Sequence, residues 1–253
     1  MSSFRLLTKD LGNGNTLHII DIETIDEALK ACLDNLFVKV CEGNRDMDLM
    51  TAKKRVASFL HTKKGSTTEM GAVAEFFLHI FLNEQGFVPQ FLYTNLEENS
   101  IKKGFDGYYL FATEEWILES KSGSIETVGI SHGKKIKECY EDIKMKLAGA
   151  GPNNPWENAY KHASQLDVGA DPNVRKNIDR LSQLYDTGVF QPIDESNLIS
   201  GATIFLNGTW RKTDVPSIEK EIIEIVNKLK FRKILILCVT KQTIQLFMNY
   251  LKA

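Results

Sequence analysis

Three charged residues that could act together in a reaction lie near the middle of the chain, in two short apolar stretches. Residues 105–111 carry Asp106 near their start, and residues 116–121 end with Glu119 and Lys121. Because side chains alternate between the two faces of a strand, Glu119 and Lys121 are expected to point the same way. Two carboxylates beside one ammonium group suit a hard cation with oxygen ligands, such as Mg²⁺ or Mn²⁺. A cation of this kind polarises a phosphate and activates a water molecule, so the pattern indicates metal-assisted phosphodiester hydrolysis.

The two stretches are predicted to pair as a β-hairpin. If the turn is centred between Thr113 and Glu114, Asp106 lies opposite Lys121 and diagonal to Glu119, which gathers all three groups at one end of a hairpin face. The alternative is that the three side chains form a solvated strand face with a cross-strand ion pair. The hairpin alone leaves both interpretations open.

A further carboxylate interrupts an apolar helix upstream. This helix is predicted to run from Ser66 to about Gln85, because residues 66–69 form a capping-box pattern and Gly86 follows its end. Glu75 lies inside its apolar run, where a carboxylate must reach solvent, a partner or a metal. Alternatively, Glu75 belongs to a polar stripe of the helix, together with His79 and Asn83.

The predicted secondary structure around these residues alternates between helices and strands. The spacing of apolar residues predicts helices over residues 26–40, 47–61, 66–85, 216–230 and 242–251. It predicts a short strand over 16–20 and sheet strands near 88–94, 105–111, 116–121, 202–206 and 233–239. Helices alternating with strands imply an α/β fold with a mixed sheet covered on both faces. We therefore expect a single domain over residues 1–253, with residues 131–199 as a mostly helical insertion within it.

The composition of the chain is that of an ordinary globular protein. Its 253 residues include 31 Lys and Arg and 33 Asp and Glu, for a net charge of −2. No apolar run is long enough for a membrane span, and the four cysteines form no metal or disulfide pattern, so we expect a cytoplasmic protein with reduced thiols. A net charge near zero argues against a protein that binds nucleic acid by itself through overall electrostatic attraction, so contacts with nucleic acid must use local patches or a partner.

Two clusters of basic residues are candidates for such patches. They cover residues 45–64 and 134–146, and each is either a solvated helix face or a surface that follows a phosphate backbone.

The order of these motifs resembles that of the PD-(D/E)XK, or restriction-endonuclease-like, nuclease superfamily. In that superfamily a helix bearing Glu precedes three strands, with Asp on the second strand and Glu-x-Lys on the third. The matching segments here are residues 71–75, 104–107 and 119–121. The resemblance implies that Glu75, Asp106 and Glu119 bind the metal, and that Asp106, Glu119 and Lys121 are catalytic. It also implies a restriction-endonuclease-like sheet, although the proline that often precedes the Asp is absent.

The length, the placement of the motifs and the helical segment after Glu-x-Lys also resemble the nuclease subunit of the Hachiman anti-phage defence system. That resemblance implies a nuclease that cleaves DNA under the control of a helicase-like partner. The alternative in another functional class is a catalytically silent nuclease fold with a binding or regulatory role. The presence of all four motif residues together favours the enzyme.

A minor alternative is a DEDD-type 3′–5′ exonuclease. Asp21 and Glu23 resemble its first motif, and residues 162–167 have the spacing of its last. Its middle motif is missing, however, and the chain after Glu23 enters a helix where that fold continues with a hairpin. The competing interpretation is a helix entry with Asp26 as the N-cap.

Overall fold

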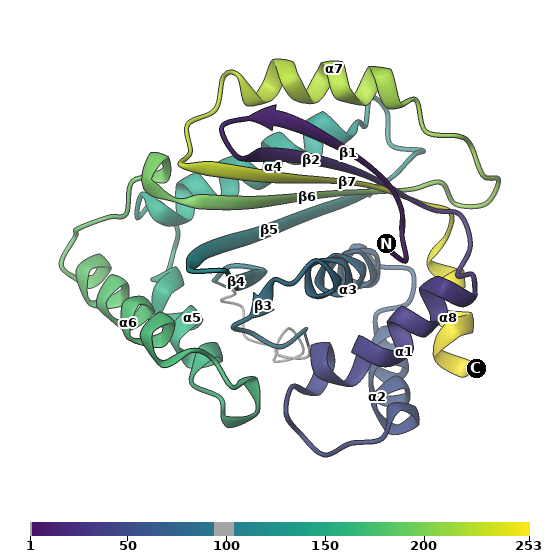
Figure 1. Ribbon diagram of the computed structural model, residues 1–253, viewed down its shortest axis with the longest axis horizontal. Coiled ribbons are helices and arrows are strands. Elements are labelled where there is room, and N and C mark those ends of the chain that lie inside the picture. Colours follow the sequence, from purple (N-terminus) through teal and green to yellow (C-terminus); the bar gives the residue numbers. More distant parts are fainter. Residues whose placement is uncertain (1, 94–103) are drawn as a thin grey trace.

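The computed structural model describes residues 2–93 and 104–253, and its centre is one mixed sheet of seven strands. The strand order is β1-β2-β7-β6-β5-β4-β3 (Figure 1). The four central strands, β2, β7, β6 and β5, run parallel to one another, and antiparallel pairs complete both edges. The strands are β1 (Arg5–Gly12), β2 (Asn15–Ile22), β3 (Val88–Pro89), β4 (Gly107–Phe111), β5 (Glu114–Ser124), β6 (Asn197–Phe205) and β7 (Lys233–Lys241).

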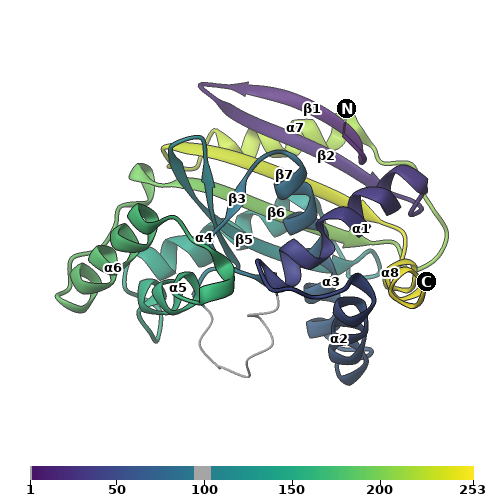
Figure 2. The ribbon, with the colours of Figure 1, turned by 60° about the horizontal axis from the view of Figure 1, so that its bottom comes forward.

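Helices cover both faces of this sheet (Figure 1, Figure 2). One apolar core lies between the sheet and four helices, which are α1 (Glu27–Glu42), α2 (Leu49–Thr62), α3 (Thr67–Glu84) and α8 (Ile244–Lys252). A second core lies on the opposite face, with the helices α4 (His132–Leu147), α5 (Pro155–Ala163), α6 (Pro172–Asp186) and α7 (Val215–Val226). Because helices cover both faces, the central strands β6 and β7 are buried along almost their whole length.

The predicted α/β fold with a mixed sheet is confirmed, with differences at the sheet edges. Strand β1 was not predicted, because its mostly exposed, polar residues give no apolar alternation. The strand expected over 88–94 is a two-residue β3 in the described part, and residue 94 lies outside the described residues. Strand β6 begins at Asn197, five residues earlier than predicted, so the helical segment ends before residue 199.

The segment expected to be a helical insertion contributes to the sheet packing itself. Helix α4 packs directly on β5 and β6 and connects them as a crossover between parallel strands. Helices α5 and α6 pack against each other and extend the second core (Figure 1). The position of α4 decides which of its side chains reach β5.

Lys241, at the end of β7, is a buried cation inside the first core. Its side chain is fully buried, and its Nζ lies 3.9 Å from the centroid of the Phe77 ring. Within the described residues, no hydrogen-bond acceptor reaches this Nζ. Burial lowers the pKa of Lys241 to about 7, from an ordinary value of 10.5. The folded protein therefore binds this proton less tightly than the unfolded chain does.

We expect Lys241→Met to stabilise the protein by about 2–3 kcal/mol at pH 7, since it removes a buried charge and keeps the apolar volume. In the native protein, stability should rise as the pH rises from about 7 towards 10.5, because only the unfolded chain stays protonated there. Urea unfolding at pH 7 and pH 9 measures both effects. A variant that is less stable than the native protein at both pH values would show that interactions in the core compensate the charge of Lys241.

Candidate functional site

The β4–β5 hairpin brings Asp106 and Glu119 together. The observed pairs, from Gly107 with Leu118 to Phe111 with Glu114, place the turn at residues 112–113. This register differs by two residues from the predicted one, in which Asp106 faced Lys121. Since side chains alternate with a period of two, a two-residue shift leaves every side chain on its predicted face.

Asp106 precedes β4 and is fixed to β5 by two hydrogen bonds. Its backbone N–H donates to the Leu118 carbonyl at 3.1 Å, and its Oδ2 accepts from the Ser120 N–H at 2.8 Å. Continuing the ladder by one residue places Asp106 beside Glu119 rather than beside Lys121. The two predicted carboxylates therefore lie together at the end of the hairpin.

Glu119 lies between two ammonium groups. Its Oε1 accepts from Lys121 Nζ at 2.9 Å, and its Oε2 accepts from Lys146 Nζ at 2.6 Å. The Glu119 side chain is only 2% exposed, whereas those of Lys121 and Lys146 are 28% and 23% exposed. The carboxylate thus forms the buried floor of the cluster, and the lysines connect it to solvent.

Helix α4 supplies the other side of this cluster. Ser131 caps the helix by accepting from the Lys134 N–H, and one face of the helix buries Ile136, Cys139 and Ile143 against the sheet. Asp142 and Lys146 are four residues apart and therefore share a helix face. Asp142 pairs with Lys121, and Lys146 pairs with Glu119. We call Asp106, Glu119, Lys121, Asp142 and Lys146 the carboxylate–lysine cluster.

Burial and neighbouring charges shift the pKa values in this cluster. Burial raises the pKa of Glu119 to about 7, the charge of Asp106 adds to this rise, and the two lysines oppose it. Burial alone would lower the pKa of Lys121, but the Glu119 carboxylate raises it above its usual range. Lys121 is therefore a permanent cation that donates hydrogen bonds and takes up no proton at neutral pH.

The donor set of the cluster fits a hard divalent cation. Asp106 and Glu119 are adjacent carboxylates, and Mg²⁺ in proteins is commonly held by one or two carboxylates, with water and substrate phosphate completing its shell. Burial raises the pKa of Glu119 because it disfavours the charged carboxylate, and a divalent cation beside it would favour that charged form. In the described parts of the chain, no group of three or more His, Cys, Asp or Glu side chains is placed to hold a metal.

Glu75, the third predicted ligand, lies on the other face of the sheet. It is buried on α3, which packs against the face of β5 that carries Leu118. The side chain of Glu119 belongs to the opposite face, with Ile117 and α4. The assignment of Glu75 as a metal ligand therefore stays a prediction.

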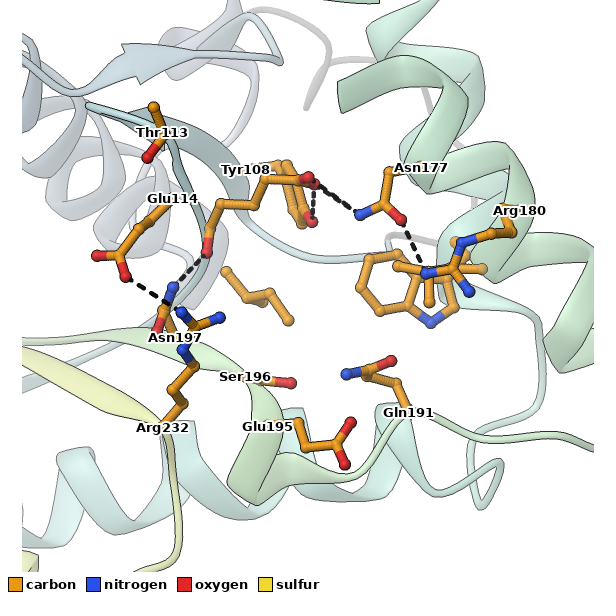
Figure 3. A pocket seen from close by; sticks show the side chains of 14 residues that line it. Tyr108, Thr113, Glu114, Asn177, Arg180, Gln191, Glu195, Ser196, Asn197 and Arg232 are labelled. Atoms are coloured by element: carbon orange, nitrogen blue, oxygen red, sulfur yellow. Dashed lines mark hydrogen bonds and ion pairs between the residues drawn. The ribbon is translucent and has the colours of Figure 1, made fainter. Parts of the chain in front are cut away.

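A separate polar pocket of about 340 Å³ lies further along the same sheet face, between the β4–β5 turn, α6 and the start of β6 (Figure 3). In it, the Glu115 carboxylate accepts from the Tyr108 hydroxyl and the Asn177 amide, and Asn177 accepts from Arg180. Glu115 and Glu119 are four residues apart on β5, which separates them by about 13 Å. Glu115 is thus engaged by its neighbours, and the pocket lies away from the carboxylate–lysine cluster.

The carboxylates that resembled a DEDD motif have other contacts. Asp21 accepts from the Thr213 hydroxyl, and Glu23 pairs with Arg5. Asp26 caps α1 by accepting from the Leu29 N–H, which confirms the helix-entry interpretation. The structure therefore favours a structural role for this acidic segment.

Many residues of the basic clusters form ion pairs within the chain. Arg45 and Arg55 both contact Glu42, and Lys53 is buried beside Asp34. In the second cluster, three lysines pair with acids: Lys135 with Glu138, Lys144 with Glu141, and Lys146 with Glu119. The sequence analysis did not identify Asp142 as a site residue, and it assigned Lys146 only to a basic helix face. The four-residue spacing of Asp142 and Lys146 on the helix after Glu-x-Lys was the available signal.

Comparison with known proteins gives one family. A family model described as HamA, Hachiman system protein A, matches residues 3–249. Neither the curated proteins nor the solved structures gave a match. No helix in the described part of the chain is both long enough and apolar enough to span a bilayer.

Proposed function

The chain belongs to the HamA family of the Hachiman anti-phage defence system, and on this premise we propose that it is a metal-dependent nuclease that hydrolyses DNA and works with a helicase partner. The observation that carries the proposal is the carboxylate–lysine cluster, in which Asp106, Glu119 and Lys121 meet at the end of the β4–β5 hairpin. These are the residues that the Asp motif at 104–107 and the Glu-x-Lys motif at 119–121 singled out.

In the proposed reaction, Asp106 and Glu119 would hold the metal ion. When bound, Mg²⁺ or Mn²⁺ would supply a polarised phosphate and a water of lowered pKa. Lys121, as a permanent cation, orients the attacking water or offsets the negative charge that develops on the phosphate. Asp142 fixes the position of Lys121, because its carboxylate lies in contact with the Lys121 ammonium.

A nicking assay on supercoiled plasmid tests the proposal. The protein is incubated with Mg²⁺ or Mn²⁺, with and without the helicase partner, and with a chelator as the control. We expect metal-dependent nicking that Asp106→Asn removes, since this change deletes a charged ligand oxygen. The absence of cleavage under every condition, with the protein folded and the partner bound, would contradict the nuclease assignment.

A second candidate is a silent nuclease fold that only binds its partner. It is favoured by the two ion pairs of Glu119, because ammonium groups occupy both oxygens that a metal needs. The two candidates differ in metal binding. The silent fold predicts that Mn²⁺ leaves the melting temperature unchanged, whereas a nuclease site predicts an increase that depends on Glu119.

Lys146 provides a further prediction about this site. It competes with a metal for Glu119, so we expect Lys146→Met to lower, by several-fold, the Mg²⁺ concentration that gives half-maximal nicking. Lys144→Met is the matched control, since Lys144 lies on the same helix and pairs with Glu141 instead. A Mg²⁺ titration of both variants gives the comparison. Equal half-maximal concentrations in the two would show that Lys146 does not restrain the carboxylate.

A further inference from the structure

A groove of about 840 Å³ lies between α2, α8 and the start of α3. These helices cover the sheet face opposite to the carboxylate–lysine cluster (Figure 1). We call this the α2–α8 groove. Its floor is apolar and is formed by Met50, Ala57, Ile244, Met248 and Leu251.

The rim of the α2–α8 groove is basic. Lys54, Lys64 and Lys252 are exposed there, and none of them forms an ion pair with another residue in the described ranges. The acid in the lining, Glu69, is buried, and its Oε2 accepts from the Gly65 N–H at 2.7 Å. The rim therefore presents uncompensated positive charge around an apolar floor.

We infer that the α2–α8 groove docks an acidic amphipathic helix of the protein partner. The apolar floor fits the apolar face of such a helix, and the lysines of the rim complement its acidic flanks. Met50, which is 44% exposed, and Met248 are unbranched side chains that can adapt to a partner surface. The identity of the partner as the helicase rests on the proposed function.

The same features argue against two other occupants. A nucleic acid would use the lysines, but its phosphates would gain nothing from an apolar floor. A second copy docked symmetrically would bring basic rim against basic rim, since a two-fold interface joins the same patch on both subunits. An acidic partner avoids both problems.

The location also suits a partner that leaves the reaction site open. Figure 1 and Figure 2 place α2 and α8 together, with the sheet between them and α4. A helix bound in the groove would therefore not cover Glu119 or Lys121. Docking and cleavage use separate faces, so they can be tested separately.

The test measures the affinity of the purified full chain for the purified helicase partner by calorimetry, at low and high salt. We expect Met50→Glu and the double variant Lys54→Glu/Lys252→Glu each to weaken binding by about tenfold or more. Two exposed residues outside the groove give matched controls, Leu166→Glu for the apolar change and Lys220→Glu for the charge reversal, and both should bind as the native protein does. Native affinity should fall as salt rises.

Three results would overturn the inference. Groove variants that bind as tightly as the controls would place the interface elsewhere. A concentration-dependent dimer that Met50→Glu abolishes would assign the groove to a second copy, and a loss of DNA binding in the double variant, with helicase affinity intact, would assign it to nucleic acid. If the native chain does not bind the helicase at all, both the docking inference and the proposal of a helicase partner are wrong. The nuclease proposal is tested separately by the nicking assay. Melting temperatures of all variants confirm that each is folded.

Discussion

Lys121→Arg is expected to reduce metal-dependent plasmid nicking by about a thousandfold while leaving the fold and the metal affinity nearly unchanged. The Lys121 ammonium contacts Glu119 and Asp142 in a site that is only partly open to solvent. Arginine keeps the charge, but its broad planar fork does not fit where a compact ammonium donates to two carboxylates. Lys121→Ala should be equally inactive.

Two measurements distinguish a catalytic Lys121 from a Lys121 that only forms a surface ion pair. The matched control is Lys144→Arg, a change on the exposed face of α4 that should cleave at the native rate. The Mn²⁺-dependent rise in melting temperature should survive in Lys121→Arg, because lysine is not a metal ligand. Nicking at the native rate by folded Lys121→Arg would remove the support for its catalytic role, since an exposed ion pair tolerates this change at a cost of at most about 1 kcal/mol.

Glu119→Gln is expected to lose both nicking, again by about a thousandfold, and the metal-dependent stabilisation, because it removes a charged ligand oxygen. The same change should stabilise the metal-free protein. Burial raises the pKa of Glu119 to about 7 in the folded state, from an ordinary value of 4.5. The folded protein therefore binds this proton more tightly than the unfolded chain, and native stability falls as the pH rises from about 4.5 to about 7.

The pH dependence of the free energy of unfolding provides a control for the Glu119→Gln prediction. At pH 5 the native side chain is mostly protonated, so Glu119→Gln should change the free energy of unfolding little. At pH 8 we expect the variant to be more stable than the native protein by about 1–3 kcal/mol. Urea unfolding without metal at both pH values gives the comparison. A variant that is destabilised equally at both would show that the two lysines hold Glu119 fully charged in the native state.

These two variants together discriminate between the candidate functions. The nuclease proposal expects loss of activity from both and loss of metal binding from Glu119→Gln alone. A silent fold expects neither variant to alter metal-dependent behaviour. A gain in stability at the cost of function is common at active sites, where groups are held in unfavourable surroundings.

The local features of this protein could be predicted from its residues alone. The alternation of side chains along residues 116–121 placed Glu119 and Lys121 on one face, with Ile117, before any pairing was known. Helical spacing and caps located α1 and α3, whose N-caps are Asp26 and Ser66. These features follow from the periods of 2 and 3.6 residues and from side-chain hydrogen bonds to neighbouring backbone, which are properties of short segments.

The hairpin register could not be predicted from local patterns and depends on long-range packing. The turn at residues 112–113 uses Ala112 with a positive φ of 53°, and no glycine or asparagine marks it in the sequence. The same is true of the sheet order, in which β7, the last strand of the chain, lies between β2 and β6. Pairing of distant strands depends on packing across the whole sheet, which no local pattern records.

The composition of the candidate site was also decided by tertiary packing. Asp142 and Lys146 join the carboxylate–lysine cluster because α4 crosses from β5 to β6 and lays one polar strip of its surface against Glu119 and Lys121. Lys241 ends in the core for a similar reason, since α3 covers the end of β7 with Phe77. The sequence specifies which side chains a helix carries on each face, but the docking of helix on sheet selects the partners that those side chains meet.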